Sequence, residues 1–204
     1  MNYLAHVYLS GSDDCILAGN FMGDFVKGND WKTLPVGLGN GVVLHRLIDS
    51  YTDEHPISSD LRAHLRPVTG KYSGIALDMV YDHLLASNWS QHAKGDLEQF
   101  SCSIYERLEV FRSVMPLECL ALFDAMKSTN WLYEYRTREG LDRALNGLDR
   151  RIGRRTGLSH VLEHLEMNIE TFKSGFSRFF PDVQRECSKK LATFASLSNS
   201  ELNS

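Results

Sequence analysis

The fold is decided by the stretch Gly41-Val-Val-Leu-His45-Arg46-Leu-Ile-Asp49-Ser-Tyr-Thr-Asp53-Glu-His55-Pro56. Its apolar residues recur at helical spacing, which predicts a helix with one buried face. His45, Asp49 and Asp53 follow one another at i, i+4 and i+8, so their side chains project from one stripe beside that face. Such a stripe offers nitrogen and carboxylate oxygen to a metal ion, although an isolated His–Asp pair also occurs as a hydrogen-bonded surface pair.

Two further clusters of polar residues lie within apolar segments, and this repetition favours a functional site. Asp78, Asp82 and His83 recur in a second apolar helical segment. Burial of a carboxylate is costly unless it is paired or bound to a cation. Internal salt bridges to Arg46 or Arg62 would satisfy the two aspartates, but metal or substrate contact is the preferred interpretation. The third cluster comprises Asn2, His6, Asn20 and Asp24.

The composition is that of an ordinary globular protein, with 43% hydrophobic and 24% charged residues among 204. Apolar residues recur at helical spacing nearly everywhere, and the sequence has no convincing run of strict alternation bounded by hairpin turns. An all-α fold is therefore predicted, a single-domain helical bundle over residues 1–204. Residues 1–95 carry the polar clusters, residues 96–197 form a helical scaffold with a candidate partner-docking surface, and residues 198–204 form a frayed tail.

Caps and breakers divide the chain into helices. Helices are expected over residues 3–9, 15–26, 41–55, 61–66, 74–89, 97–111, 117–135, 158–173 and 179–197. Residues 34–41 are expected to form a loop before the central helix, and residues 58–60 to cap the helix that stops near Pro67. Gly19 and Gly23 are poor helix formers, each costing about 1 kcal/mol relative to Ala, so another group is expected to approach the backbone closely at both.

Several classes of protein are disfavoured. The four cysteines are scattered, without a C-x-x-C pair, so neither a disulfide framework nor a structural zinc site is predicted. No apolar run is long enough to cross a bilayer, and the first residues do not resemble a signal peptide. We therefore expect a cytoplasmic protein with no membrane partner. The formal net charge of −4 argues against general binding to nucleic acid.

Charge is unevenly distributed, because one stretch of this acidic protein is strongly basic. Its arginines are Arg136, Arg138, Arg143, Arg150, Arg151, Arg154 and Arg155, against only three acidic residues. A run of charge is often only a solvated helix face. The alternative is a docking surface for an acidic partner, whose attraction would steer the encounter and weaken with salt.

The donor set of the three clusters suits hydrolysis at phosphorus. Histidine and aspartate without cysteine favour a divalent cation such as Mn²⁺ or Mg²⁺, which polarises a phosphoryl oxygen and lowers the pKa of bound water. The expected metal ligands are Asp24, His45, Asp49 and Asp78. The expected catalytic residues are His6 and Asp82, as further ligands or groups that orient them; Arg46 and His83, which would hold or protonate phosphate oxygens; and Asp53 and His55, which would orient water or cap the helix.

Four motifs in the first 90 residues, taken together, resemble the bacterial acyl carrier protein phosphodiesterase family, whose members are also called acyl carrier protein hydrolases. The motifs are Asn2-Tyr-Leu-Ala-His6, Gly19-Asn-Phe-Met-Gly-Asp24-Phe-Val-Lys-Gly28, Leu44-His-Arg-Leu-Ile-Asp-Ser-Tyr-Thr-Asp-Glu-His-Pro56, and Leu77-Asp-Met-Val-Tyr-Asp-His-Leu-Leu-Ala86 with Asn88-Trp89. Looser matches follow at Trp131-Leu-x-x-Tyr135 and Phe179-Phe-Pro181.

The resemblance implies an HD-domain-like helical fold and Mn²⁺-dependent hydrolysis of holo-acyl carrier protein. The bond cleaved would be the phosphodiester that joins 4′-phosphopantetheine to a serine of the carrier protein, and the products would be apo-acyl carrier protein and free 4′-phosphopantetheine. The resemblance also gives the arginine-rich stretch a partner, because acyl carrier proteins are small and strongly acidic.

One departure separates the chain from the wider HD superfamily. The adjacent His-Asp doublet that names the superfamily is absent, and Asp82-His83 has the reverse order. Its metal ligands are therefore not transferred position by position. Two alternatives remain at this stage: an HD-type phosphohydrolase of nucleotides or guanosine polyphosphates, and a non-catalytic helical adaptor for an acidic protein.

Overall fold

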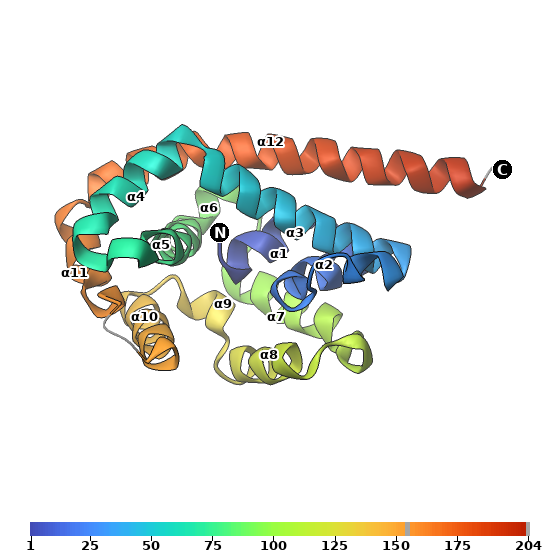
Figure 1. Cartoon of the computed structure of the whole chain (residues 1–204), viewed down its shortest axis with the longest axis horizontal. Coiled ribbons are helices and arrows are strands. Elements are labelled where there is room, and N and C mark those ends of the chain that lie inside the picture. The colour runs from blue at the N-terminus through green and yellow to red at the C-terminus, as the bar shows by residue number, and fades with distance from the viewer. Residues whose placement is uncertain (154–155, 203–204) are drawn as a thin grey trace.

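The protein is all-α, as predicted, in a computed structural model that describes residues 1–153 and 156–202, with side chains described as far as residue 197. No strand occurs among those residues. Figure 1 shows the α-helices α1 (Tyr3–Leu9), α2 (Asp14–Phe21), α3 (Val36–Glu54), α4 (Pro56–Thr69), α5 (Ser73–Ser87), α6 (Trp89–His92), α7 (Leu97–Glu109), α8 (Leu117–Thr129), α9 (Trp131–Glu134), α10 (Arg138–Ile152), α11 (Val161–Met167) and α12 (Ile169–Leu202). Short 3₁₀ turns join several of them: η1 (Gly23–Phe25), η2 (Asp30–Thr33), η3 (Gly70–Tyr72), η4 (Arg112–Val114) and η5 (Leu158–His160).

The central helix α3 begins earlier than predicted, because α2 packs closely against its first turns. A Cβ atom on Gly19 would lie 2.0 Å from the carbonyl oxygen of Leu38, and one on Gly41 would lie 2.3 Å from that of Ile16. The expectation of a loop over residues 34–41 is wrong for residues 36–41, which belong to α3. Glycine disfavours an isolated helix, but here it lets two backbones meet, and tertiary contact outweighs local propensity.

Helix α1 lies in the middle of the molecule and is fixed by a carboxylate from α5 (Figure 1). Asp82 is fully buried and accepts hydrogen bonds from the backbone N–H groups of Leu4 at 2.7 Å, Ala5 at 3.2 Å and Asn2 at 3.3 Å. Burial raises the pKa of Asp82 to about 7, although these hydrogen bonds favour the charged form. The carboxylate thus satisfies amide groups at the start of α1 that no side chain of α1 itself caps.

Pro67 and Pro181 both lie inside helices. A helix was expected to end near Pro67, and another was expected to begin beside Pro181. Helix α4 continues through Pro67 to Thr69, and its cap is His55, whose Nδ1 accepts from the N–H of Ile57. Ser58 instead contacts the hydroxyl of Tyr81 at 3.0 Å, so the expected cap over residues 58–60 is wrong. Likewise α12 runs unbroken through Pro181. Burial of Phe179 and Phe180 before that proline and of Val183 after it holds the helix together.

Helix α12 extends past the body of the molecule at its C-terminal end (Figure 1). The tail expected from residue 198 has a helical backbone as far as Leu202, and residues 203–204 lie outside the described part of the chain. Within the described residues, no helix is long and apolar enough to span a membrane.

We expect Gly19→Ala to lower the free energy of unfolding by about 1–3 kcal/mol, because the added Cβ collides with backbone of α3. Gly147→Ala is the matched control. A Cβ there meets no atom within 4 Å, so this substitution should raise the free energy of unfolding, by about 1 kcal/mol at most. Urea unfolding followed by circular dichroism measures both, and equal stability of Gly19→Ala and the wild type would contradict the packing argument.

Candidate metal centre

Two buried histidines and one aspartate converge where α1 meets α3. The Nε2 atom of His6 lies 3.1 Å from Oδ1 of Asp49, and the Nε2 atom of His45 lies 3.1 Å from Oδ2 of the same carboxylate. The two imidazole rings stack with centroids 4.2 Å apart. One ligand atom from each of the three residues lies within 4.8 Å of the other two, so this group can hold a metal ion.

Two more carboxylates surround this locus. Asp24 follows α2 and places Oδ1 3.2 Å from Nε2 of His45, with 60% of its side chain accessible. Asp78 contacts the Met1 ammonium group at 2.9 Å, and that ammonium lies 3.8 Å from Asp49. The structure thus brings Asp24, His45 and Asp49 together with His6, and Asp78 reaches this group through the Met1 ammonium.

The electrostatics of the group favour a cation. Burial disfavours charge on His45, but hydrogen bonds with Asp24 and Asp49 outweigh it and raise the pKa of His45 to about 9. Burial likewise opposes ionisation of Asp49, yet contacts with His45 and His6 hold its pKa well below the usual range. For His6, burial and the neighbouring His45 lower the pKa. The ionised carboxylates therefore stabilise positive charge at this site.

Asn20 orients both imidazoles, a role that was not predicted from its place in a polar cluster. The Nδ1–H of His6 donates to the Asn20 side-chain oxygen at 2.8 Å, and the Nδ1–H of His45 donates to the Asn20 carbonyl oxygen at 2.9 Å. The Asn20 amide is itself fixed, because it donates to the His6 carbonyl and to Ser10. Both Nε2 atoms are consequently directed at the carboxylates.

This arrangement fits a metal ion. Each Nδ1 donates to Asn20, so each Nε2 is the atom that faces carboxylate oxygen, at 3.1–3.2 Å. A proton on Nε2 satisfies this contact in the charged form of His45, and a metal ion that displaces the proton can satisfy it as well. A spacing of about 3 Å is also that of neighbouring ligands around an octahedral ion with bonds of about 2.1 Å. Gly23 preserves the geometry, since a Cβ there would lie 2.1 Å from the His45 ring. The expected close approaches at Gly19 and Gly23 are both confirmed.

The other expected catalytic residues have structural partners away from the two histidines. Arg46 donates to the carbonyl of Val26 at 2.9 Å, and the Nδ1–H of His83 donates to the carbonyl of Tyr135 at 2.8 Å. Asp82 caps α1 as described above. None of Arg46, His83 and Asp82 lines the cavity beside the metal centre.

Asp53 and His55, expected to orient water or cap a helix, differ in position. Asp53 lines the cavity and pairs with Arg62 at 3.1 Å. His55 caps α4, and its Nε2 lies 3.4 Å from Asp182. The salt bridges from Asp78 or Asp82 to Arg46 or Arg62, considered from the sequence, are not formed among the described residues.

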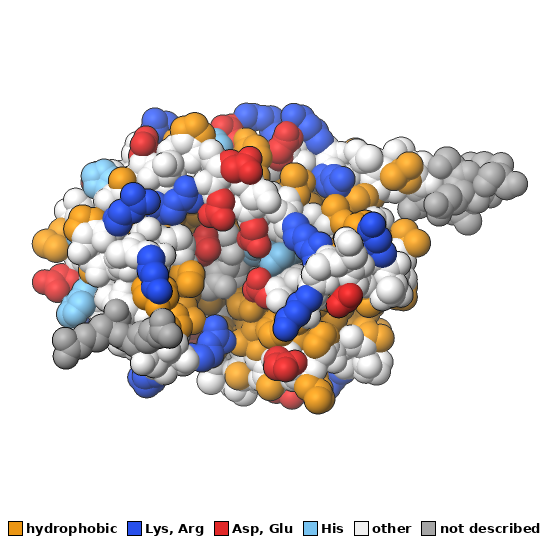
Figure 2. All heavy atoms as spheres, in the orientation of Figure 1, with side chains coloured by type: hydrophobic (Ala, Val, Ile, Leu, Met, Phe, Trp, Pro, Cys, Tyr) orange, Lys and Arg blue, Asp and Glu red, His pale blue; other side chains and the backbone are white. Residues whose placement is uncertain are grey.

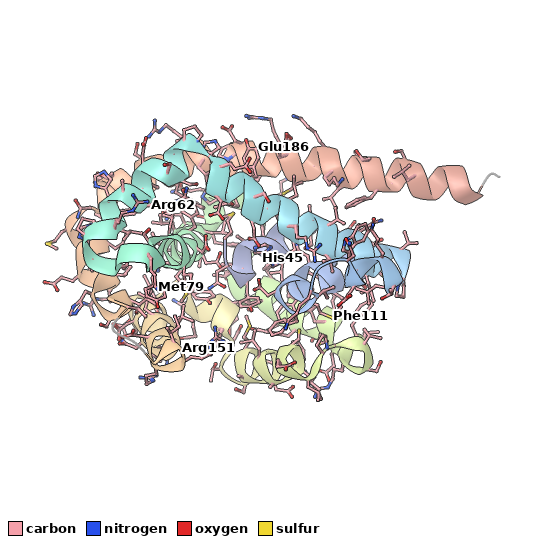
Figure 3. All side chains as sticks on the ribbon, in the orientation of Figure 1. His45, Arg62, Met79, Phe111, Arg151 and Glu186 are labelled. Carbon is pink, nitrogen blue, oxygen red and sulfur yellow. The ribbon has the colours of Figure 1, made fainter. Side chains whose placement is uncertain are left out.

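A cavity of about 610 Å³ opens from the metal centre toward α10. One wall carries His45 and four aspartates, and the facing wall is formed by α8, α9 and α10. Figure 2 shows the hollow, with acidic side chains and a histidine along one edge and hydrophobic side chains below. Figure 3 places His45, Met79 and Arg151 around it.

The arginine-rich stretch forms most of α10, and its members differ in their pairing. Arg138 pairs with Glu166, and Arg143 pairs with Glu134. The guanidinium of Arg136 stacks over Tyr133 at 4.0 Å. The exposed arginines of the stretch that form no ion pair with the described part of the chain are Arg136, Arg150 and Arg151, while Arg154 and Arg155 lie outside it.

Comparison with known proteins identifies the family. The family model described as acyl carrier protein phosphodiesterase matches residues 1–183. The chain belongs to the acyl carrier protein phosphodiesterase family. It is 30% identical over 191 residues to the acyl carrier protein phosphodiesterases of Escherichia coli O6:H1, Enterobacter sp. strain 638 and Escherichia coli K12. Each alignment covers 93% of this chain and 99% of the relative, and no solved structure matches.

The predicted family and the predicted class of enzyme, a hydrolase of phosphodiester bonds, are both confirmed by these comparisons. They favour a catalyst over the non-catalytic adaptor. The fold is confirmed as all-α, whereas likeness to HD domains stays a prediction.

Replacement of Asn20 by Ala should weaken binding of Mn²⁺ by about 10–100-fold, because His6 loses the acceptor that fixes its tautomer. Asn168→Ala, a matched change in a residue that caps α11 far from the site, should leave the affinity unchanged. Isothermal titration with Mn²⁺ measures both. An Asn20→Ala variant that folds and binds as tightly as the wild type would contradict the assigned role.

Proposed function

We propose that the chain hydrolyses holo-acyl carrier protein to apo-acyl carrier protein and 4′-phosphopantetheine. The observation that carries this proposal is the convergence of two imidazoles and three carboxylates at one end of a cavity in a member of this family. The substrate is that of the activity for which the relatives are named.

The proposed reaction is hydrolysis of one phosphodiester bond. The oxygen of water forms a bond to phosphorus, and the bond from phosphorus to the carrier protein's serine oxygen breaks. One proton of the water goes to that serine oxygen, and the other leaves as the phosphate monoester ionises. No oxidant or second substrate is required.

We infer that the cofactor is Mn²⁺, or Mg²⁺ as the nearest alternative, since hard divalent cations accept carboxylate and imidazole ligands. When bound, such an ion supplies an electrophile for a phosphoryl oxygen and acidifies water. His6 and His45 would hold it through Nε2, and Asp24 and Asp49 through carboxylate oxygens. Asp78 would act as a further ligand or orient a bound water.

The proposal also covers the relationship of this fold to HD domains and the location of the protein in the cell. Ligands contributed by separate helices of an all-α domain support an HD-like relationship, even though the adjacent His-Asp doublet is absent. Activity on acyl carrier protein would place the chain in the cytoplasm, in the control of fatty acid biosynthesis.

The partner surface is proposed to include the unpaired arginines of α10. Acyl carrier protein is strongly acidic, and α10 forms one wall of the cavity where its prosthetic group must enter. Arg138 and Arg143 are already neutralised by glutamates, so they contribute less to the attraction than Arg150.

Purified protein should release 4′-phosphopantetheine from holo-acyl carrier protein with Mn²⁺ and not after addition of chelator. His45→Ala should lower kcat/KM by at least about a thousandfold, because a metal ligand is lost. The readout is the mass of the carrier protein, with Arg178→Gln, an exposed change on α12, as control. Undiminished activity of His45→Ala would overturn the site, and hydrolysis of a nucleotide panel instead would favour the nucleotide phosphohydrolase.

Reversal of charge at Arg150 should weaken the encounter with acyl carrier protein. Arg150→Glu should raise KM several-fold and reduce the dependence of kcat/KM on salt, with kcat little changed, because the residue lies outside the cavity. Arg178→Glu, which makes the same change in net charge, is the control. An unchanged salt dependence would remove Arg150 from the docking surface.

A further inference from the structure

The wall of the cavity that faces the metal centre has its own chemistry. It is one face of α10, where residues three or four apart in sequence lie above one another. The cavity-lining residues of that face are Gly140, Arg143, Ala144, Gly147, Leu148 and Arg151. Small and apolar residues in the middle are thus flanked by arginines.

Arg151 is the cation on this wall that is free to bind a ligand. It is exposed and forms no ion pair or hydrogen bond with the described residues, whereas Arg143 pairs with Glu134. Figure 3 shows Arg151 on α10 at the side of the cavity opposite His45. Arg46, the arginine expected from the sequence to hold phosphate, is committed to the carbonyl of Val26 and does not line the cavity.

Tyr3 lines the same cavity as Asp24 and Arg151. A ligand that occupies this cavity therefore meets both the carboxylates of the metal centre and the guanidinium on α10.

The wall of the cavity beside the metal centre repels an anion, because it carries Asp24, Asp49, Asp53 and Asp78 against the Met1 ammonium and His45. A phosphodiester needs a counter-charge on the side away from those carboxylates. A guanidinium supplies that charge, together with two parallel N–H donors.

Gly147 leaves room beside Arg151. A Cβ built on it would meet no atom within 4 Å, so the middle of α10 faces open space in the cavity. Leu148 lies next to it, and Leu122 and Trp131 line the same region. Such a surface suits a slender chain of methylene and amide groups better than a compact polar ring.

We propose that Arg151 binds the phosphate of the scissile phosphodiester and that the Gly147 face of α10 receives the arm attached to that phosphate. This inference rests on the proposed function, because it assigns parts of the same substrate to parts of the same cavity. Arg151 contacts the substrate directly, so its role differs from that of Arg150, which acts on the encounter from outside the cavity.

Arg151→Gln tests the phosphate contact on two substrates, holo-acyl carrier protein and bis(4-nitrophenyl) phosphate, which carries no pantetheine arm. The variant should lose at least about a hundredfold in kcat/KM on both, with Mn²⁺ affinity within twofold of the wild type. Arg151→Lys should recover part of the loss, since it restores charge without the fork. Arg178→Gln is the matched control. Activity of Arg151→Gln within threefold of the wild type on both substrates would overturn the assignment.

Gly147→Phe tests the arm site. It should lower kcat/KM at least about tenfold on holo-acyl carrier protein and leave that on bis(4-nitrophenyl) phosphate within threefold, with thermal stability and Mn²⁺ affinity retained. Equal losses on both substrates, or no loss on the carrier protein, would overturn the arm site.

The two proposals fail differently. A wild type that leaves holo-acyl carrier protein intact but cleaves the small diester overturns the proposed substrate and the arm site. If cleavage of the small diester still falls in Arg151→Gln, the phosphate contact is supported. If that cleavage is unaffected by the substitution, the phosphate contact is overturned as well.

Discussion

The sharing of one carboxylate by two buried imidazoles is the constraint on which the site depends. His6 and His45 come from different helices, yet each directs Nε2 at an oxygen of Asp49 at 3.1 Å. They do so because Asn20 accepts both Nδ1–H groups, one with its side chain and one with its carbonyl. A residue that touches no ligand atom therefore decides which nitrogen of each ring is available to a cation.

Much of the surrounding structure serves to bring α1, α2 and α3 close enough for this contact. Glycines at 19 and 41 let the backbones of α2 and α3 meet, and Gly23 leaves space for the His45 ring. Asp82 fixes the start of α1 through three backbone amides, so His6 is placed by a carboxylate from α5. This explains a buried aspartate that from the sequence looked like a ligand.

The cavity joins two kinds of chemistry that are separate in the sequence. Its near wall concentrates negative charge and would hold a divalent cation, while its far wall on α10 offers a free arginine and a glycine-lined surface. In the proposed complex a phosphodiester would lie between the cation and the guanidinium, and an acidic protein carrying that diester would be drawn to the same helix. In this proposal Arg150, which lies outside the cavity, attracts the substrate, and Arg151, which lines the cavity, orients it.

Sequence by itself determined the helical class and the family, because helical periodicity and short motifs are local properties, and it named most residues that surround the candidate metal centre. It placed α3, α4 and α12 with errors at Gly, Ser and Pro, where local propensity is weaker than burial. Only the tertiary structure separated the candidate metal ligands from residues with structural roles. Asp49 and Asp82 are alike in a sequence, but one meets two imidazoles and the other meets the amides of α1. The physical reason is that coordination and capping depend on distances between helices, which no spacing along one helix encodes.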